Sequence, residues 1–128
     1  MEAVTIVLVD KKVVAVVEDD PSMLKGVRRL LNAHGFATEA YASAEAFLER
    51  AAASEAGCLV LDINLGGISG IELQRRLAAA GSRLPVIFMT AVDSEGVQRE
   101  AIEAGCIAYL RKPFPARQLI DAIGKAVG

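Results

Sequence analysis

The 128-residue sequence has no tryptophan, one histidine (His34), two cysteines and only 5% aromatic residues. One histidine excludes any site that needs two imidazoles, and two cysteines indicate neither a disulfide framework nor a metal cluster. No apolar run approaches the ~18 residues that a membrane helix needs, and no signal-peptide cleavage site follows the first hydrophobic block. The net charge of −2 gives no electrostatic reason to expect nucleic acid or an anionic membrane as partner. We therefore expect a cytoplasmic protein with an aliphatic core.

Short apolar runs alternate with amphipathic stretches along most of the chain. Five runs have the length of buried strands, and each is followed by a stretch with helical spacing and a helix-starting or helix-ending residue. The predicted strands are residues 13–17, 36–41, 58–62, 85–89 and 107–110. The predicted helices begin near Pro21, Ser43, Ser69, Asp93 or Ser94, and Pro115. Such alternation predicts an α/β fold with a parallel sheet and helices on both faces.

One further apolar run, residues 4–9, precedes this alternation. We assign residues 1–12 to an N-terminal extension and residues 13–128 to a single domain. Six β-branched or aliphatic residues are poorly suited to solvent, so we expect the run to pair with an exposed sheet edge or with another chain.

Polar residues follow four of the five predicted strands at their carboxyl ends. They are Glu18 and Asp19, Asp62, Thr90, and Lys112. In an open parallel sheet these ends face one crevice, where ligands bind. Carboxylates brought together need a cation, and oxygen-only ligands favour Mg²⁺ over zinc or copper. A carboxylate nucleophile, a hard cation, a hydroxyl and a lysine together suit phosphoryl transfer.

Four motifs in these positions resemble one known family. The motifs are VVEDD at 16–20, LVLDINL at 59–65, MTA at 89–91 and LRKPF at 110–114. In this order and spacing they are similar to the receiver domains of bacterial two-component response regulators. The resemblance covers residues 13–127 and implies a flavodoxin-like five-stranded sheet in the order 2-1-3-4-5. It also implies a phosphoacceptor that assists its own phosphorylation and dephosphorylation, not an enzyme with a separate substrate.

The resemblance implies a role for each acidic residue. Asp62 is expected to accept a phosphoryl group from the phosphohistidine of a sensor histidine kinase or phosphotransfer protein. Asp19 is expected to bind Mg²⁺ directly, with Glu18 as its acidic neighbour. The Asn64 backbone carbonyl should complete the protein's share of the coordination.

The remaining motif residues are expected to hold the phosphoryl group and report its presence. Thr90 should hydrogen-bond one phosphoryl oxygen and Lys112 should pair with another. The bond between Lys112 and Pro113 is expected to be cis. Tyr109 occupies the switch position, whose ring turns inward as the threonine moves. The altered surface would bind a second copy of the chain or an effector protein.

The loop after Asp62 departs from the family pattern. Leu65-Gly66 replaces the usual Met-Pro, and Gly66 frees a φ angle that proline would fix. Val92, two residues after Thr90, cannot orient a water molecule, which favours a long-lived phosphoryl group.

Two other functions remain open at this point. A receiver-like module could bind a partner without being phosphorylated, although the complete set of motif residues argues against it. A phosphatase of the haloacid dehalogenase type would also use an aspartyl nucleophile, but Asn64 stands where that family has a second aspartate. Structural roles compete for single residues: Asp20 as a helix N-cap, Thr90 as a strand-end hydroxyl and Tyr109 as a core aromatic.

Overall fold

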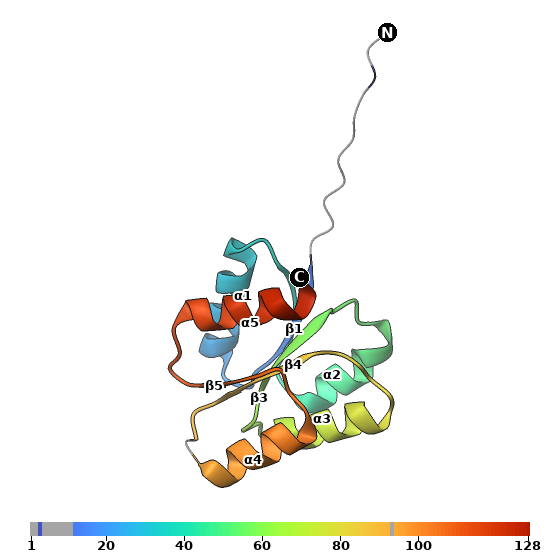
Figure 1. The fold of residues 1–128 in the computed structure, drawn as a ribbon. Helices are drawn as coiled ribbons and strands as arrows, with labels where there is room; N and C mark the ends of the chain where they lie inside the picture. Colours follow the sequence, from blue (N-terminus) through green and yellow to red (C-terminus); the bar gives the residue numbers. More distant parts are fainter. Residues whose placement is uncertain (1–2, 4–11, 93) are drawn as a thin grey trace.

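The computed structural model describes residues 3, 12–92 and 94–128, so the predicted strand at 4–9 lies outside the described residues. Strands and helices alternate through the described chain (Figure 1). The strands are β1 (Val13–Val17), β2 (Ala37–Tyr41), β3 (Cys58–Asp62), β4 (Val86–Thr90) and β5 (Ala108–Arg111). The helices are α1 (Pro21–Ala33), α2 (Ala44–Arg50), the 3₁₀ turn η1 (Ala51–Ala53), α3 (Gly70–Ala79), α4 (Glu95–Ala104) and α5 (Ala116–Val127).

The five strands form one parallel sheet in the order β2-β1-β3-β4-β5, as the resemblance implied. β3 lies at the centre, and all five of its residues are buried. Its neighbours β1 and β4 are also almost wholly buried, which explains why their sequences are continuous apolar runs. The order places the carboxyl ends of β1, β3 and β4 side by side.

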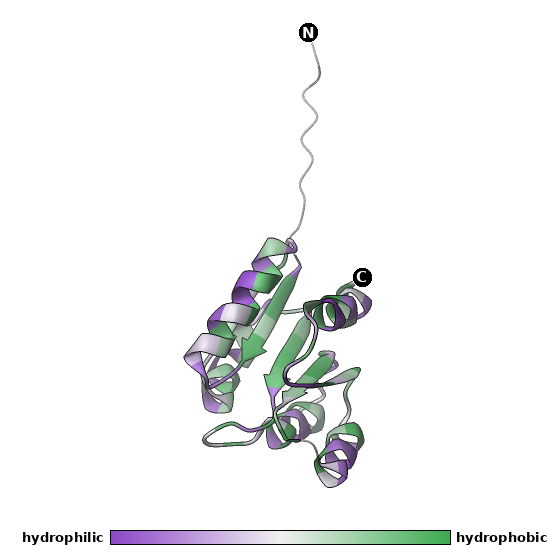
Figure 2. Ribbon diagram, turned by 90° about the vertical axis from the view of Figure 1, so that its left-hand side faces the viewer, coloured by the Kyte–Doolittle hydropathy of each residue, from purple (hydrophilic) through white to green (hydrophobic). Residues whose placement is uncertain are grey.

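Alternate residues of the strands contribute to two separate cores. Val17, Leu61 and Phe88 face the cluster that α2, α3 and α4 cover, whereas Val16 and Val60 face the cluster under α1 and α5. Figure 1 shows these two groups of helices on opposite sides of the sheet, and Figure 2 shows apolar strands between helices that carry polar residues on their outer sides. Alternate residues face different cores because successive side chains of a strand point to opposite faces of the sheet.

The helix boundaries follow from their capping residues. The Asp20 carboxylate accepts a hydrogen bond of 2.9 Å from the Ser22 N–H, which confirms Asp20 as the N-cap of α1. α1 ends where Gly35 adopts a φ of 86°, and the Phe36 N–H donates to the Leu31 carbonyl at 3.0 Å. This is the Schellman arrangement that favours glycine.

The other helix starts also agree with the sequence patterns. Ser43, Ser69 and Ser94 each accept a hydrogen bond from a backbone N–H in the first turn of α2, α3 and α4. Asp93, the alternative start of α4, lies outside the described residues. Strand limits differ from the predicted ones by one residue at several ends, and η1 was not predicted. None of the helices in the described ranges has the length and apolar character needed to cross a membrane.

Candidate functional site

Three carboxylates meet at the carboxyl edge of the sheet. Glu18 follows β1 and is 1% exposed, Asp62 ends β3 and is 4% exposed, and Asp19 lies beside them on the surface. One oxygen from each of the three lies within 4.8 Å of the others. The parallel pairing of β1 with β3 explains this arrangement, because Val17 lies opposite Leu61 and both strands end at the same level. The structure thus brings together the acidic residues predicted from the sequence.

Lys112 supplies the positive charge of the site. Its Nζ lies 2.5 Å from Glu18 Oε1 and 3.6 Å from Asp62 Oδ2. Its backbone N–H donates to the Thr90 carbonyl at 2.7 Å, which ties the lysine to the end of β4. The Lys112–Pro113 peptide bond is cis, and the amine lies near Asp62, so both parts of that prediction are confirmed.

The buried charges of the site are unbalanced without a further cation. Burial and the adjacent Glu18 carboxylate together raise the pKa of Asp62 to about 7, although Lys112 and the Asn64 N–H oppose the rise. Burial alone would also raise the pKa of Glu18, but hydrogen bonds with Asp62 and Lys112 outweigh it and lower the pKa. Of the two buried carboxylates, Asp62 is therefore the one that binds a proton more readily.

Thr90 is completely buried, and its hydroxyl is held by two donors. Oγ1 accepts hydrogen bonds from the Val92 N–H at 3.1 Å and from Asn64 Nδ2 at 3.3 Å. The Asn64 N–H donates to Asp62 Oδ1 at 3.3 Å. The contact between the Asn64 side chain and Thr90 was not expected, because sequence reasoning gave Asn64 only a backbone role. An amide two residues after the central aspartate was the signal for it.

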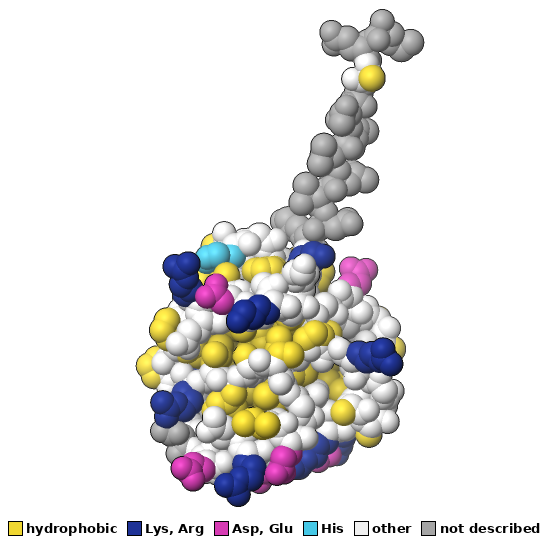
Figure 3. All heavy atoms as spheres, viewed as in Figure 1, with side chains coloured by type: hydrophobic (Ala, Val, Ile, Leu, Met, Phe, Trp, Pro, Cys, Tyr) yellow, Lys and Arg dark blue, Asp and Glu magenta, His cyan; other side chains and the backbone are white. Residues whose placement is uncertain are grey.

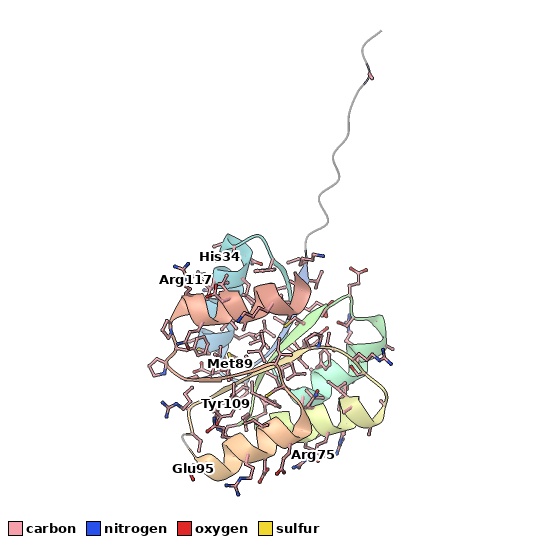
Figure 4. All side chains as sticks on the ribbon, viewed as in Figure 1. His34, Arg75, Met89, Glu95, Tyr109 and Arg117 are labelled. Carbon is pink, nitrogen blue, oxygen red and sulfur yellow. The ribbon has the colours of Figure 1, made fainter. Side chains whose placement is uncertain are left out.

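Tyr109 and Lys112 line a groove of about 710 Å³ that continues from the site toward α4 and α5. Tyr109 is half-buried and packs against the core cluster under α4, with its hydroxyl buried. Figure 4 shows Tyr109 on the α4 side of β5, and Figure 3 shows hydrophobic side chains gathered across the same face between α5 and α4. The predicted switch residue thus lies between the acidic site and the surface of α4 and α5.

The donor set of the site fits a hard divalent cation. Glu18, Asp19 and Asp62 offer carboxylate oxygens, and the backbone carbonyl of Asn64 lies in the loop that leaves Asp62. Oxygen ligands of this kind suit Mg²⁺. A cation there would also favour the ionised form of Asp62, whose proton is otherwise retained by burial and by Glu18. These residues therefore fit the predicted metal.

One contact of the site region was missed by sequence reasoning. The carboxylate of Glu45, at the start of α2, accepts a hydrogen bond of 2.7 Å from the Ile68 N–H in the loop between β3 and α3. The residues are 23 positions apart, and an exposed glutamate in a first helical turn is ordinarily explained by the helix dipole. No sequence signal distinguished a glutamate that favours the helix dipole from one that contacts the loop.

Comparisons with known proteins agree with this geometry. The family model of the response regulator receiver domain matches residues 14–124. The response regulator protein TmoT of Ectopseudomonas mendocina is 33% identical over 117 residues, which are 91% of this chain and 53% of TmoT. The transcriptional regulatory protein FixJ of Azorhizobium caulinodans is 35% identical over 90% of this chain and 54% of its own. The chain thus spans about half the length of the curated relatives it matches.

Solved structures show the same fold. The crystal structure of FixJ-N superimposes with a TM-score of 0.86 at 33% identity, covering 93% of this chain and 95% of that one. The structure of the response regulator StyR gives a TM-score of 0.84 at 42% identity, covering 92% of this chain and 60% of that one. Receiver domains are generally non-enzymatic signalling domains, and they typically hold Mg²⁺ in an acidic pocket such as the one described above. The chain belongs to the receiver-domain family of response regulators.

Proposed function

We propose that Asp62 accepts a phosphoryl group, in a Mg²⁺-dependent reaction, from the phosphohistidine of a sensor histidine kinase or phosphotransfer protein. The observation that carries the proposal is the position of its carboxylate. It is 4% exposed, lies within 4.8 Å of Glu18 and Asp19, and stands 3.6 Å from the Lys112 amine. A nucleophile surrounded by metal ligands and a lysine suits transfer of a group that carries negative charge on several oxygens.

Each residue of the site has a separate role in the transfer. An Asp62 oxygen attacks phosphorus, the phosphorus–nitrogen bond of the donor breaks, and its electron pair returns to the histidine nitrogen. Glu18, Asp19, Asp62 and the Asn64 carbonyl would hold Mg²⁺, which neutralises charge on the transferred group. Lys112 then exchanges part of its contact with Glu18, at 2.5 Å, for a phosphoryl oxygen. The product is a mixed anhydride of Asp62.

The Thr90 hydroxyl couples the reaction to the surface. Its oxygen now accepts hydrogen bonds from Val92 and Asn64. Its O–H would donate to a phosphoryl oxygen on Asp62, which would draw the side chain away from those two donors. Movement of Thr90 would vacate space on the side of β4 that faces Tyr109, whose strand pairs with β4. Turning of that ring would reshape the groove that Tyr109 lines, and thereby change binding of an effector protein or a second copy of the chain.

The proposal includes the remaining expectations from the sequence. Residues 13–128 are the receiver unit and residues 1–12 an extension to it. The chain assists its own phosphorylation and dephosphorylation and does not turn over a separate substrate. Val92 is 42% exposed, and an apolar side chain there favours slow loss of the phosphoryl group. The proposed location is cytoplasmic.

Acetyl phosphate and Mg²⁺ provide the test without a kinase. The wild-type protein should gain one phosphoryl group, detected by intact-protein mass spectrometry and released by hydroxylamine, as expected for an acyl phosphate. Asp62→Asn should abolish labelling, and Asp19→Asn should lower the rate of labelling. Lys112→Ala should disturb the surface change more than the labelling itself.

Asp121→Asn is the matched control, because Asp121 is an exposed aspartate on α5 and should be labelled like the wild type. Label on a serine or threonine, or undiminished labelling of Asp62→Asn, would contradict the proposal. Steady turnover of a small phosphate ester would instead indicate a phosphatase. A protein that takes no label under any condition would be an interaction module.

A further inference from the structure

The loop of residues 63–69, between β3 and α3, is held from outside by α2. Ile68 donates its backbone N–H to Glu45 Oε1 at 2.7 Å, a short distance for such a bond. Glu45 lies in the first turn of α2, whose start is fixed by the Ser43 cap. The hydrogen bond with Ile68 is the foremost reason that the pKa of Glu45 is lowered. The acceptor is therefore a carboxylate, which makes a stronger bond than a neutral oxygen.

Gly67 allows the loop to pass close to this carboxylate. A Cβ built on Gly67 would lie 2.5 Å from Glu45 Oε1 and 2.9 Å from Oε2. Any other residue at this position would have to displace the carboxylate from the Ile68 N–H. Glycine at position 67 thus leaves room for the Glu45 carboxylate that accepts from Ile68.

The same loop reaches the acidic site at its other end. Asn64 donates to Asp62 through its N–H and to Thr90 through its side chain. A Cβ on the next-but-one residue, Gly66, would lie 3.8 Å from Asp19 Oδ2, so the loop backbone borders the proposed metal ligands. The Ile68 end of the loop is thus only four residues along the chain from the Asn64 carbonyl.

The loop lacks the covalent stiffness that proline would give it. Gly66 and Gly67 are adjacent, and glycine has the largest backbone freedom of all residues. Partial packing of Leu65 and Ile68 on the core restrains their side chains but leaves the glycine pair without apolar anchors. A hydrogen bond from a capped helix is a direct means of fixing the backbone beside this pair.

We propose that Glu45 is a positioning residue, whose carboxylate fixes the β3–α3 loop and so holds the Asn64 carbonyl in place for Mg²⁺. The inference rests on the proposed function, because it assumes that the acidic site binds Mg²⁺. A residue that merely favours the dipole of α2 would stabilise that helix without affecting the loop or the metal.

The test combines hydrogen exchange of the metal-free protein with Mg²⁺ titration by calorimetry. Glu45→Ala should accelerate exchange of the Ile68 amide and weaken Mg²⁺ binding about tenfold, the lower end of the range for groups that orient metal ligands. Glu45→Gln keeps an acceptor oxygen, so its Ile68 amide exchange and its Mg²⁺ affinity should change less than those of Glu45→Ala. Glu49→Ala is the matched control, since Glu49 is an exposed glutamate on the same helix, and neither readout should change.

A double-mutant cycle gives an independent test. Gly67→Ala should reproduce both effects of Glu45→Ala, because its methyl group displaces the carboxylate from Ile68. Combining the two substitutions should add little to either alone, since both remove the same contact. Full additivity of the two losses would overturn the proposal.

The remaining outcomes separate this inference from the proposed function. Unchanged exchange of the Ile68 amide in Glu45→Ala, or wild-type affinity for Mg²⁺ in that variant, overturns the role of Glu45 alone. A wild-type protein that binds no Mg²⁺ overturns the proposed function and this inference together. Accelerated exchange with weakened Mg²⁺ binding supports both.

Discussion

The charge state of Asp62 depends on the residues around it. Two nearly inaccessible carboxylates, Asp62 and Glu18, share one lysine, which is 2.5 Å from Glu18 and 3.6 Å from Asp62. Lys112 therefore compensates Glu18 better than Asp62. Burial and the Glu18 carboxylate raise the pKa of Asp62, whereas hydrogen bonds with Asp62 and Lys112 outweigh burial at Glu18 and lower its pKa. The buried position of Asp62 thus carries an energetic cost that a cation or a chemical role has to offset.

Asp62→Asn should stabilise the metal-free protein at pH 8. The pKa of Asp62 is about 7 in the fold against an ordinary 3.8, so the folded state loses stability as the pH rises from about 4 through 7. An asparagine amide can donate to Glu18 as the protonated carboxyl does, without this loss. We expect the free energy of unfolding of the variant to be higher than that of the wild type by about 1–3 kcal/mol at pH 8 and by less at pH 5. Urea unfolding with a chelator present measures this difference.

Asp121→Asn provides the control for this pH dependence. Asp121 is exposed and its described ion pair with Arg117 spans 3.9 Å, so the same chemical change should have little effect at either pH. If Asp62→Asn changes stability equally at pH 5 and pH 8, then ionisation of Asp62 does not oppose folding.

At the scale of elements, the sequence was informative where a local rule operates. Asp20, Gly35 and the three serine caps mark helix ends through contacts within a few residues, and these ends were predicted. The hydrogen bonds between Glu45 and Ile68 and between Asn64 and Thr90 join positions more than 20 residues apart. Such contacts depend on loop paths and rotamers, for which no periodicity in the chain gives a rule.

The junction of β3 and α3 is another feature that local rules do not reveal. Gly70 starts α3, and its N–H donates to the Ile63 carbonyl at 3.0 Å. A Cβ on Gly70 would lie 3.0 Å from Ile63 Cα and from the carbonyl carbon of Asp62, and closer still to the Asp62 carbonyl oxygen. The obstruction is backbone, so it cannot move aside as a side chain would. α3 therefore approaches β3 closely only because residue 70 is glycine.

Gly70→Ala should destabilise the fold by about 1–3 kcal/mol, the usual cost of forcing extra volume into a packed site. Gly26→Ala is the matched control, because Gly26 lies inside α1 and a Cβ there would meet nothing within 4 Å. Replacement of that helical glycine should stabilise by about 0.5–1 kcal/mol. Urea unfolding of both variants measures the difference, and equal effects would show that the β3–α3 junction tolerates a side chain.

At the scale of the whole molecule, the strand order assembles the site from distant parts of the chain. β1, β3 and β4 end together at one edge, and β5 delivers Lys112 beside them. Because the acidic residues come from separate strands, unfolding disperses them and leaves no site for a divalent cation. Binding of Mg²⁺ at the proposed site would therefore be linked to folding of the entire domain.

Mg²⁺ should consequently raise the free energy of unfolding, by about 2.7 kcal/mol when its free concentration is 100 times its dissociation constant. The gain should be larger at pH 8 than at pH 5, because Mg²⁺ binds the ionised form of Asp62, whose pKa near 7 leaves it largely protonated at pH 5. Asp19→Asn should lose most of the gain, since it removes one of the three carboxylates. NaCl at equal ionic strength is the control for general screening of charges. If NaCl stabilises the protein as much as Mg²⁺ does, or if Asp19→Asn responds like the wild type, then the three carboxylates do not act together as a cation site.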